Sequence, residues 1–298
     1  MSAKRRKVLQ TLLAGAGAAA LGPAAAGNYV FNENRAFPQP DTFMPKGNIN
    51  HAVCQWTYGH LSLEDLCKLC KQIGISAIDL VGPKGWPTLQ KYGLDSSMCN
   101  GAEINLVDGF NDPANHAKLV ANYTEHIELV SKAGYKNLIC FSGNRRGMDD
   151  ETGLKNCTEG LKKIVGLAEK KGVVLVMELL NSKVDHKDYM CDKTPWGVEL
   201  CKRVGSPNFK LLYDIYHMQI DEGDVIRTIQ TYHPYIAHYH TAGVPGRHEI
   251  DETQELNYPA IMKAIVKTGF KGYVAQEFMP VAADKAASLK AAVQLCDV

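Results

Sequence analysis

Short apolar runs alternate with longer segments of mixed polar and apolar residues from about residue 49 to the C-terminus. The runs predict eight strands, near residues 50–56, 77–81, 96–102, 137–142, 173–179, 209–215, 236–241 and 273–278. The segments between them carry helix signals, such as a candidate N-cap at Ser62 and a candidate left-handed C-terminal residue at Gly74. Eight strands that alternate with helices predict the α/β class and a single (β/α)8 TIM barrel.

The run at 173–179, VVLVMEL, is the clearest strand, and it contains an anomaly. Its apolar residues are those of a strand that is buried on both faces of a parallel sheet. Glu178 interrupts them, and an unpaired buried carboxylate would cost several kcal/mol. A proton, a cationic side chain or a metal ion must therefore neutralise Glu178.

Three more polar residues stand near the ends of later runs: Asp214 in FKLLYDIYH, His240 in IAHYHTAG and Glu277 in YVAQEFMP. Singly, Asp214 could cap the next helix, His240 could be a hydrogen-bonded core histidine, and the glutamates could pair with Lys or Arg. As a set with Glu178 they should converge, because the strands of such a barrel all point their carboxyl ends at one face. The sequence therefore predicts one divalent metal ion at the barrel mouth, with Mg²⁺ or Mn²⁺ favoured and Co²⁺ or Zn²⁺ able to compete.

The N-terminus has the composition of an export signal. Residues 1–26 hold four basic residues and no acid, followed by an Ala/Leu/Gly stretch and an AAA end. The Arg5-Arg6 pair favours the twin-arginine route and a periplasmic or otherwise exported protein. The apolar stretch is shorter than the ~20 residues of a membrane span. We predict a signal peptide over 1–26, an irregular arm over 27–48 and the barrel over 49–298.

Charge and cysteine content narrow the function classes. Without the four basic residues of the leader, 29 basic residues stand against 32 acidic ones, which favours neither nucleic acid nor an anionic membrane as a partner. The nine cysteines are odd in number and scattered through apolar patterns, so we expect buried free thiols. A small-molecule partner is expected, and a homo-oligomer is compatible with the sequence.

The motifs around the four polar residues resemble those of the xylose isomerase-like barrel superfamily, over roughly residues 49–280. Within it, the chain is similar to hydroxypyruvate isomerases and to the related ketose 3-epimerases. The motifs are MELLN at 177–181, YDIYH at 213–217, HYHTAGVPGRHE at 238–249 and QEF at 276–278. The resemblance implies metal-ligand roles for Glu178, Asp214, His240 and Glu277, and GVPGRHE points to the hydroxypyruvate isomerase branch.

Two positions bear on the epimerase alternative in opposite directions, the first in its favour and the second against it. His240 stands where several hydroxypyruvate isomerases carry Gln and the epimerases carry His. Val184 stands where the epimerases carry an acidic residue. A dehydratase of the same superfamily is a third alternative.

The expected chemistry is proton transfer on a hydroxy-keto acid or a sugar. A metal that chelates the substrate would stabilise an enediolate, and Glu178 and Glu277 could serve as the base and the acid. We therefore predict the interconversion of hydroxypyruvate and tartronate semialdehyde. Arg247 could hold the substrate carboxylate as a bidentate fork. His217 stands where the family binds a substrate hydroxyl or carbonyl, and Lys183 is a weaker candidate for an anion contact.

Several other side chains are candidates for the wall of the site. The loop after the 173–179 strand, SKVDHKDYMCDKTP, is rich in charged and aromatic residues and is expected to flank or cover the site. Trp56, Tyr58 and Trp86 could line the pocket, although packing is the commoner role of aromatic residues in a barrel.

Overall fold

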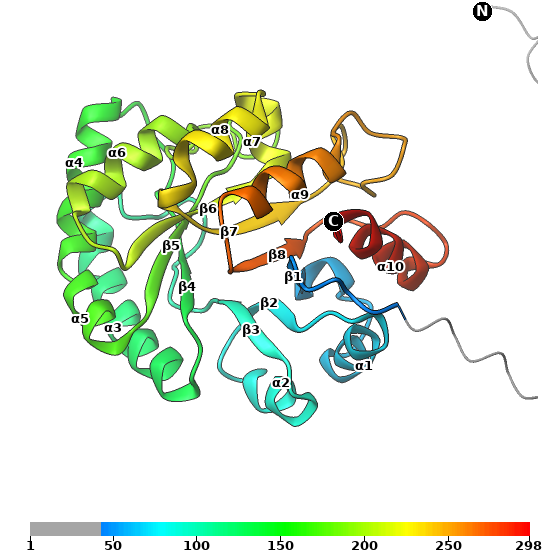
Figure 1. Cartoon of the computed structure of the whole chain (residues 1–298). Coiled ribbons are helices and arrows are strands. Elements are labelled where there is room, and N and C mark those ends of the chain that lie inside the picture. Colours follow the sequence, from blue (N-terminus) through cyan, green and yellow to red (C-terminus); the bar gives the residue numbers. More distant parts are fainter. Residues whose placement is uncertain (1–42) are drawn as a thin grey trace, which may run out of the picture. The chain divides into compact units, whose positions relative to one another are not determined.

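Eight parallel strands form a closed barrel in which each strand pairs with the next along the chain and the last pairs with the first (Figure 1). The computed structural model describes residues 43–298. The strands are β1 (Asn50–Cys54), β2 (Ala77–Val81), β3 (Asp95–Cys99), β4 (Asn137–Cys140), β5 (Val174–Glu178), β6 (Phe209–Asp214), β7 (Ile236–Thr241) and β8 (Tyr273–Gln276). All eight predicted strands are present, and the predicted barrel is confirmed.

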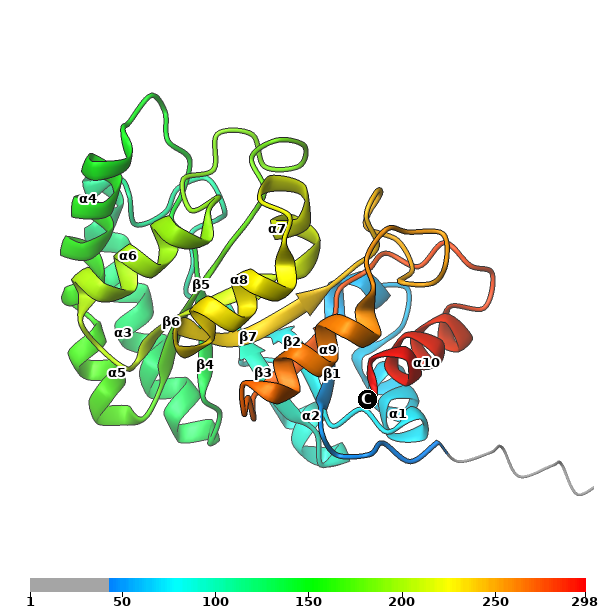
Figure 2. The same cartoon turned by 45° about the horizontal axis from the view of Figure 1, so that its top comes forward.

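The helices surround the barrel, as the two views in Figures 1 and 2 show. Three short 3₁₀ turns accompany them, at Gln55–Tyr58, Pro113–Asn115 and His233–Tyr235. The helices are α1 (Leu63–Ile73), α2 (Trp86–Tyr92), α3 (His116–Ala133), α4 (Asp150–Lys162), α5 (Val165–Lys171), α6 (Thr194–Val204), α7 (Ile215–Asp221), α8 (Val225–Tyr232), α9 (Tyr258–Lys267) and α10 (Lys285–Cys296).

The ends of α1 follow the predicted capping chemistry. The Ser62 hydroxyl accepts a hydrogen bond from the backbone N–H of Asp65 at 3.1 Å. Gly74 ends the helix with φ 79°, a left-handed conformation that favours glycine. A Cβ at this position would lie 2.8 Å from the ring of Pro45, so the close packing of the incoming chain also requires glycine.

All nine cysteines of the chain are free and buried, as predicted. Cys67 and Cys70 lie on the buried face of α1, where they pack as small apolar side chains. The CxxC spacing is therefore part of a helix face and belongs to the core.

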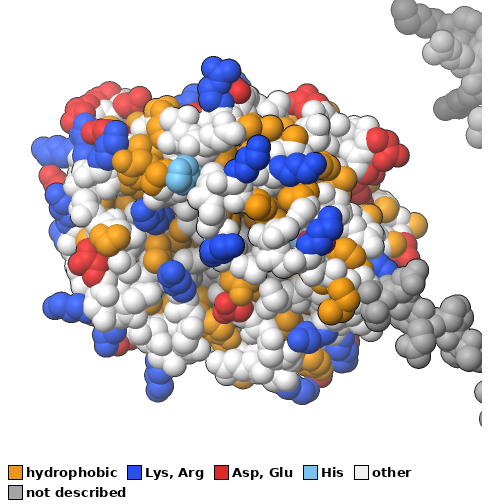
Figure 3. Space-filling view, in the orientation of Figure 1, with side chains coloured by type: hydrophobic (Ala, Val, Ile, Leu, Met, Phe, Trp, Pro, Cys, Tyr) orange, Lys and Arg blue, Asp and Glu red, His pale blue; other side chains and the backbone are white. Residues whose placement is uncertain are grey.

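The predicted signal peptide and most of the predicted arm lie outside the described residues. Within residues 43–298, no helix is long and apolar enough to cross a membrane. On the face of the molecule seen in Figure 3, Lys and Arg side chains are dispersed among apolar and acidic ones, and they form no continuous basic track on that face. This surface agrees with the near balance of basic and acidic residues in the sequence.

Candidate active site

The four predicted metal ligands come together at the carboxyl ends of β5 to β8. Glu178 and Asp214 are the last residues of β5 and β6, His240 lies near the end of β7, and Glu277 directly follows β8. All four side chains are buried, and one ligand atom of each lies within 4.8 Å of those of the others. His240 Nδ1 is 3.2 Å from Glu178 Oε1 and 2.8 Å from Glu277 Oε2.

The electrostatics of this cluster are compatible with a bound cation. Burial raises the pKa of Asp214 to about 8, even though Arg247 lies nearby and opposes the shift. Burial alone would also raise the pKa of Glu277, but His240 and Arg247 hold it well below its ordinary value. Glu178 Oε1 and His240 Nδ1 are buried and lack a well-formed hydrogen bond among the described residues. Oxygen-rich donors with unsatisfied atoms fit a divalent ion.

Asp214 also performs the structural role that its position allowed. Its Oδ1 accepts hydrogen bonds from the backbone N–H groups of Tyr216 at 2.8 Å and His217 at 3.3 Å, which begins α7. This cap fixes the carboxylate at the end of β6 and leaves Oδ2 directed at other partners, since His217 Nε2 and Arg247 Nη2 each lie 3.5 Å from Oδ2. The capping and ligand interpretations of Asp214 are thus compatible.

Arg247 is brought into the site by the loop that follows β7. Its Nη2 donates to Glu277 Oε2 at 2.6 Å. The guanidinium carbon lies 5.3 Å from the centre of the Trp56 ring and 5.4 Å from that of Tyr216, within the range of cation–π contact. Its Nε–H is buried and has no hydrogen-bond partner among the described residues, so a donor is left for a ligand.

His217 lies on α7 with its ring fully buried. The Asn181 amide donates to His217 Nδ1 at 2.6 Å, so the ring proton belongs on Nε2, which faces Asp214. Burial lowers the pKa of His217 well below its ordinary value, which favours the neutral imidazole. Its Nε2–H lacks a hydrogen-bond partner within residues 43–298 and is available to a substrate oxygen.

Lys183 lies outside the cluster, contrary to the prediction of an anion contact. Its ammonium donates to the carbonyls of Ile220 at 2.8 Å and Asp221 at 3.0 Å. These are the last residues of α7, where a cation interacts favourably with free carbonyl groups. Lys183 follows Glu178 by five positions, and its ammonium group reaches the carboxyl end of α7.

The aromatic candidates divide between the site and the core. Trp56 is 45% exposed, and its Nε1–H donates to Glu277 Oε1 at 2.9 Å, so it lies at the rim of the cluster. Trp86 is buried and donates to the Val81 carbonyl at 2.8 Å, and Tyr58 is buried. In the loop after β5, the His186 ring lies 5.2 Å from that of His217, so this loop flanks the site as predicted.

Asp79 and His238, which were not predicted as site residues, lie on the far side of His240. Asp79 Oδ2 lies 2.9 Å from His240 Nε2 and 2.6 Å from His238 Nε2, and the three side chains are fully buried. Burial alone would raise the pKa of Asp79, but the two histidines lower it to about 2. Asp79 interrupts the apolar run AIDLV just as Glu178 interrupts its own run, and this signal could have identified it.

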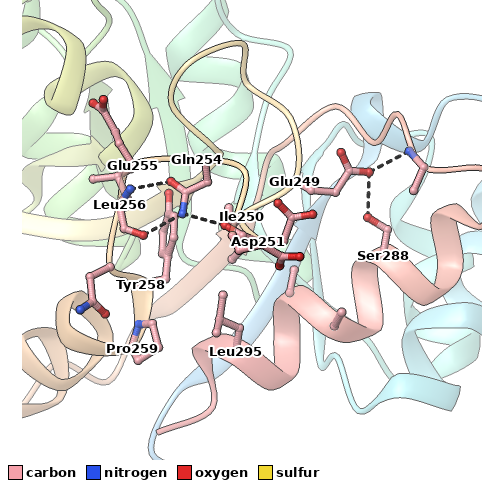
Figure 4. A pocket seen from close by; sticks show the side chains of 15 residues that line it. Glu249, Ile250, Asp251, Gln254, Glu255, Leu256, Tyr258, Pro259, Ser288 and Leu295 are labelled. Atoms are coloured by element: carbon pink, nitrogen blue, oxygen red, sulfur yellow. Dashed lines mark hydrogen bonds between the residues drawn. The ribbon is translucent and has the colours of Figure 1, made fainter.

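A separate groove lies between the loop after β7 and α10 (Figure 4). This groove of about 670 Å³ is lined in part by Glu249, Leu256, Tyr258 and Leu295. Several of its polar side chains are bonded within the protein: Glu249, for example, accepts from the Ser288 hydroxyl at 3.0 Å. None of the four clustered ligands lines the groove, so it is separate from the candidate site.

The eight parallel strands form a barrel, and the polar cluster lies at the carboxyl ends of these strands. This arrangement is that of a TIM-barrel protein, and comparison with known protein families gives the same class. The chain belongs to the xylose isomerase-like TIM barrel family, whose model matches residues 67–295. Within this family it is a hydroxypyruvate isomerase-like member and an enzyme of the isomerase type.

Two relatives and one solved structure illustrate the similarity. The chain is 24% identical to the "Putative hydroxypyruvate isomerase" of Danio rerio, over 85% of this chain and 88% of that one. It is 30% identical to the hydroxypyruvate isomerase of Escherichia coli K12, over 52% of this chain and 59% of that one. A crystal structure of an AP endonuclease, family 2, from Brucella melitensis superposes with a TM-score of 0.73, at 22% identity over 81% of this chain and 96% of that one, which shows the shared fold.

Proposed function

We propose that the protein is a metal-dependent isomerase that interconverts hydroxypyruvate and tartronate semialdehyde (2-hydroxy-3-oxopropanoate). The observation that carries the proposal is the convergence of two glutamates, a metal-ligand set and an arginine at one barrel mouth. Glu178, Asp214, His240 and Glu277 would hold one divalent ion, of which Mg²⁺ and Mn²⁺ suit these donors best. Such an ion would supply Lewis-acid chemistry, polarising the substrate carbonyl and stabilising negative charge on the enediolate.

The two glutamates would move the protons. The reaction requires a base that removes a proton from C3 of hydroxypyruvate and an acid that returns one to C2, while a hydroxyl proton passes from O3 to O2. Glu178 and Glu277 suit these roles because both lie within 3.2 Å of His240 Nδ1 and stand at the carboxyl ends of different strands. Each could therefore address the substrate from its own side.

Arg247 and His217 would orient the substrate. Arg247 has a buried Nε–H without a partner in the described part of the chain, and its guanidinium lies close to two aromatic rings. Such a group can bind a carboxylate through charge-assisted hydrogen bonds. The His217 Nε2–H, held in place by Asn181, can donate to the carbonyl or hydroxyl oxygen. A substrate with a carboxylate beside a hydroxy-ketone uses all of these groups.

A ketose 3-epimerase acting on free sugars is the second candidate, because the same metal ligands and glutamates would serve it and His240 fits the epimerase pattern. A dehydratase of the same superfamily is a third. A neutral sugar would not use the charge of Arg247, whereas hydroxypyruvate would. Substitution of Arg247 can therefore distinguish between hydroxypyruvate and a free sugar as the substrate.

The experiment compares Arg247→Ala with wild type on hydroxypyruvate and on free ketohexoses. A charge-assisted hydrogen bond is worth about 1.5–3 kcal/mol, so kcat/KM for hydroxypyruvate should fall by roughly one to two orders of magnitude, and by less for a ketose. Arg227→Ala, which removes an exposed arginine on α8, is the matched control and should leave both values unchanged. Better turnover of ketohexoses by wild type, or no selective loss in Arg247→Ala, would replace the hydroxypyruvate proposal with the epimerase one.

A further inference from the structure

A buried polar network adjoins the metal-ligand cluster inside the barrel. It consists of Asp79 on β2, Ser97 on β3, and His238 and His240 on β7, with each side chain at most 2% exposed. Strands β2 and β7 are not neighbours, so the contacts between Asp79 and the two histidines cross the barrel interior. A carboxylate in this place must be satisfied by hydrogen bonds, because it is out of reach of water.

The carboxylate of Asp79 receives three donors. His240 Nε2 and His238 Nε2 lie 2.9 Å and 2.6 Å from its Oδ2, and the Ser97 hydroxyl donates to its Oδ1. An ionised carboxylate can only accept hydrogen bonds. Whenever the His240 ring is neutral, its single proton therefore belongs on Nε2 and its lone pair on Nδ1.

This tautomer is the one that the proposed metal site needs. His240 Nδ1 is the ring atom that faces Glu178 Oε1 at 3.2 Å and Glu277 Oε2 at 2.8 Å. The opposite tautomer would direct an N–H at the ion and a lone pair at Asp79. Ligating histidines in proteins are commonly held by such a carboxylate on their other nitrogen, and loss of the carboxylate typically weakens metal binding 10–100-fold.

We propose that Asp79 is a positioning residue that fixes the orientation and tautomer of His240, so that Nδ1 is presented to a divalent ion. This inference rests on the proposed metal site. His238 supports it by sharing Asp79 Oδ2, and Ser97 by holding the other oxygen. A merely structural role would make Asp79 matter for stability and leave the intrinsic affinity of the site for metal unchanged.

The test measures the affinity of the full-length protein for Mn²⁺ by calorimetry in wild type, Asp79→Asn and Asp297→Asn. We expect Asp79→Asn to weaken Mn²⁺ binding by about 10–100-fold, because an amide can donate to His240 Nε2 and so favours the wrong tautomer. Asp297→Asn is the matched control. Asp297 is also buried and lies 3.6 Å from a histidine, His51, but belongs to no acidic cluster, so its loss should leave Mn²⁺ affinity unchanged.

A second measurement reads the tautomer of His240 directly. In long-range ¹H–¹⁵N spectra of the Mg²⁺-loaded protein, the ring of His240, assigned by its absence in His240→Gln, should carry its proton on Nε2. A proton on Nδ1 would overturn the inference, as would wild-type Mn²⁺ affinity in folded Asp79→Asn. Wild-type protein that binds no Mn²⁺ would instead refute the proposed metal site itself, so the two failures are distinguishable.

Discussion

Two buried histidine–aspartate pairs of the barrel show what separates a reactive centre from a structural contact. His240 on β7 meets Asp79 at 2.9 Å, and His51 on β1 meets Asp297, next to the C-terminus, at 3.6 Å. Both pairs are at most 1% exposed. They consist of the same residue types, yet their surroundings differ.

The difference lies in what else each group contacts. Asp297 accepts hydrogen bonds from the backbone N–H of Lys46 at 3.1 and 3.0 Å, so this pair joins the start of the barrel domain to its end. At the mouth, the second nitrogen of His240 faces Glu178 and Glu277. Burial lowers the pKa of His51. In His240 burial acts in the same direction, but the neighbouring Cys54, Glu277 and Asp79 together raise the pKa well above its ordinary value.

The comparison indicates that burial of an imidazole beside a carboxylate does not by itself make a site. A site also requires that the second ring nitrogen lies close to other donors and acceptors that lack hydrogen-bond partners. If the pair at the mouth serves chemistry and the other pair serves stability, variants of the two pairs should differ in turnover, metal binding and the free energy of unfolding.

The largest effect should come from the glutamates beside His240. In Glu178→Gln and Glu277→Gln, turnover of hydroxypyruvate should fall by about 10²–10⁴-fold, because an amide can ligate weakly but cannot exchange a proton. Glu255→Gln, which alters the groove of Figure 4, is the control and should behave as wild type. The measurement is kcat with metal content determined in parallel. Near-normal kcat in a metal-loaded variant would remove that glutamate from the acid–base chemistry.

A metal ion that binds only the folded state should stabilise the protein. Mn²⁺ at about 100 times its dissociation constant should add about 2.7 kcal/mol to the free energy of unfolding, and a chelator should remove that gain. Asp297→Asn should show the same gain as wild type, whereas His240→Ala should show little. Thermal unfolding with and without Mn²⁺ measures the effect, and an equal gain in His240→Ala would place the ion elsewhere.

The other pair should matter for stability alone. Asp297→Asn removes the negative charge that faces His51 and one of the two oxygens that accept from the Lys46 backbone N–H, so the free energy of unfolding should fall by about 1–3 kcal/mol. Turnover should not change, because neither His51 nor Asp297 belongs to a candidate metal-ligand group among the described residues. Urea denaturation measures the free energy of unfolding, and steady-state kinetics on the same preparation measure kcat. If kcat fell by more than the fraction of folded protein, the pair of His51 and Asp297 would contribute to turnover, which would contradict a purely stabilising role.

The smallest effect concerns pH. Burial depresses the pKa of His51 in the folded state, so below the ordinary histidine value of about 6.5 the unfolded chain binds protons that the folded chain resists. The free energy of unfolding of metal-free protein should therefore fall as the pH drops below about 6.5. His51→Gln should make this slope smaller. The slope should not vanish, because the buried His217, whose pKa is also lowered, remains in the variant. Identical slopes in the two proteins would mean that His51 plays no part.

Much of the fold and of the site was predictable because polar residues that interrupt apolar strands are conspicuous. Glu178 in VVLVMEL and His240 in IAHYHTAG both stand out in this way, and the repeat of strand and helix explains why they meet. Asp79 obeys the same rule in AIDLV, but its partners are on β7, and a contact across the barrel leaves no local pattern in the sequence.

Side chains on loops were harder to place. Lys183 follows Glu178 by only five residues, yet it binds carbonyls of α7, because the direction in which a loop turns depends on its tertiary neighbours. Arg247 was expected at the site, but its contact with Glu277 depends on a loop in which Arg247 itself is left-handed, with φ 60°. Composition and spacing do not specify such a backbone conformation.

The central claim is that one divalent ion lies between the side chains gathered at the mouth of the barrel. Its most direct test is an anomalous difference map from a crystal of the protein grown with Mn²⁺. The account predicts one strong peak per chain, coordinated by Glu178, Asp214, Glu277 and the Nδ1 atom of His240. A map with no peak among these four residues, or with their side chains pointing apart, would contradict it.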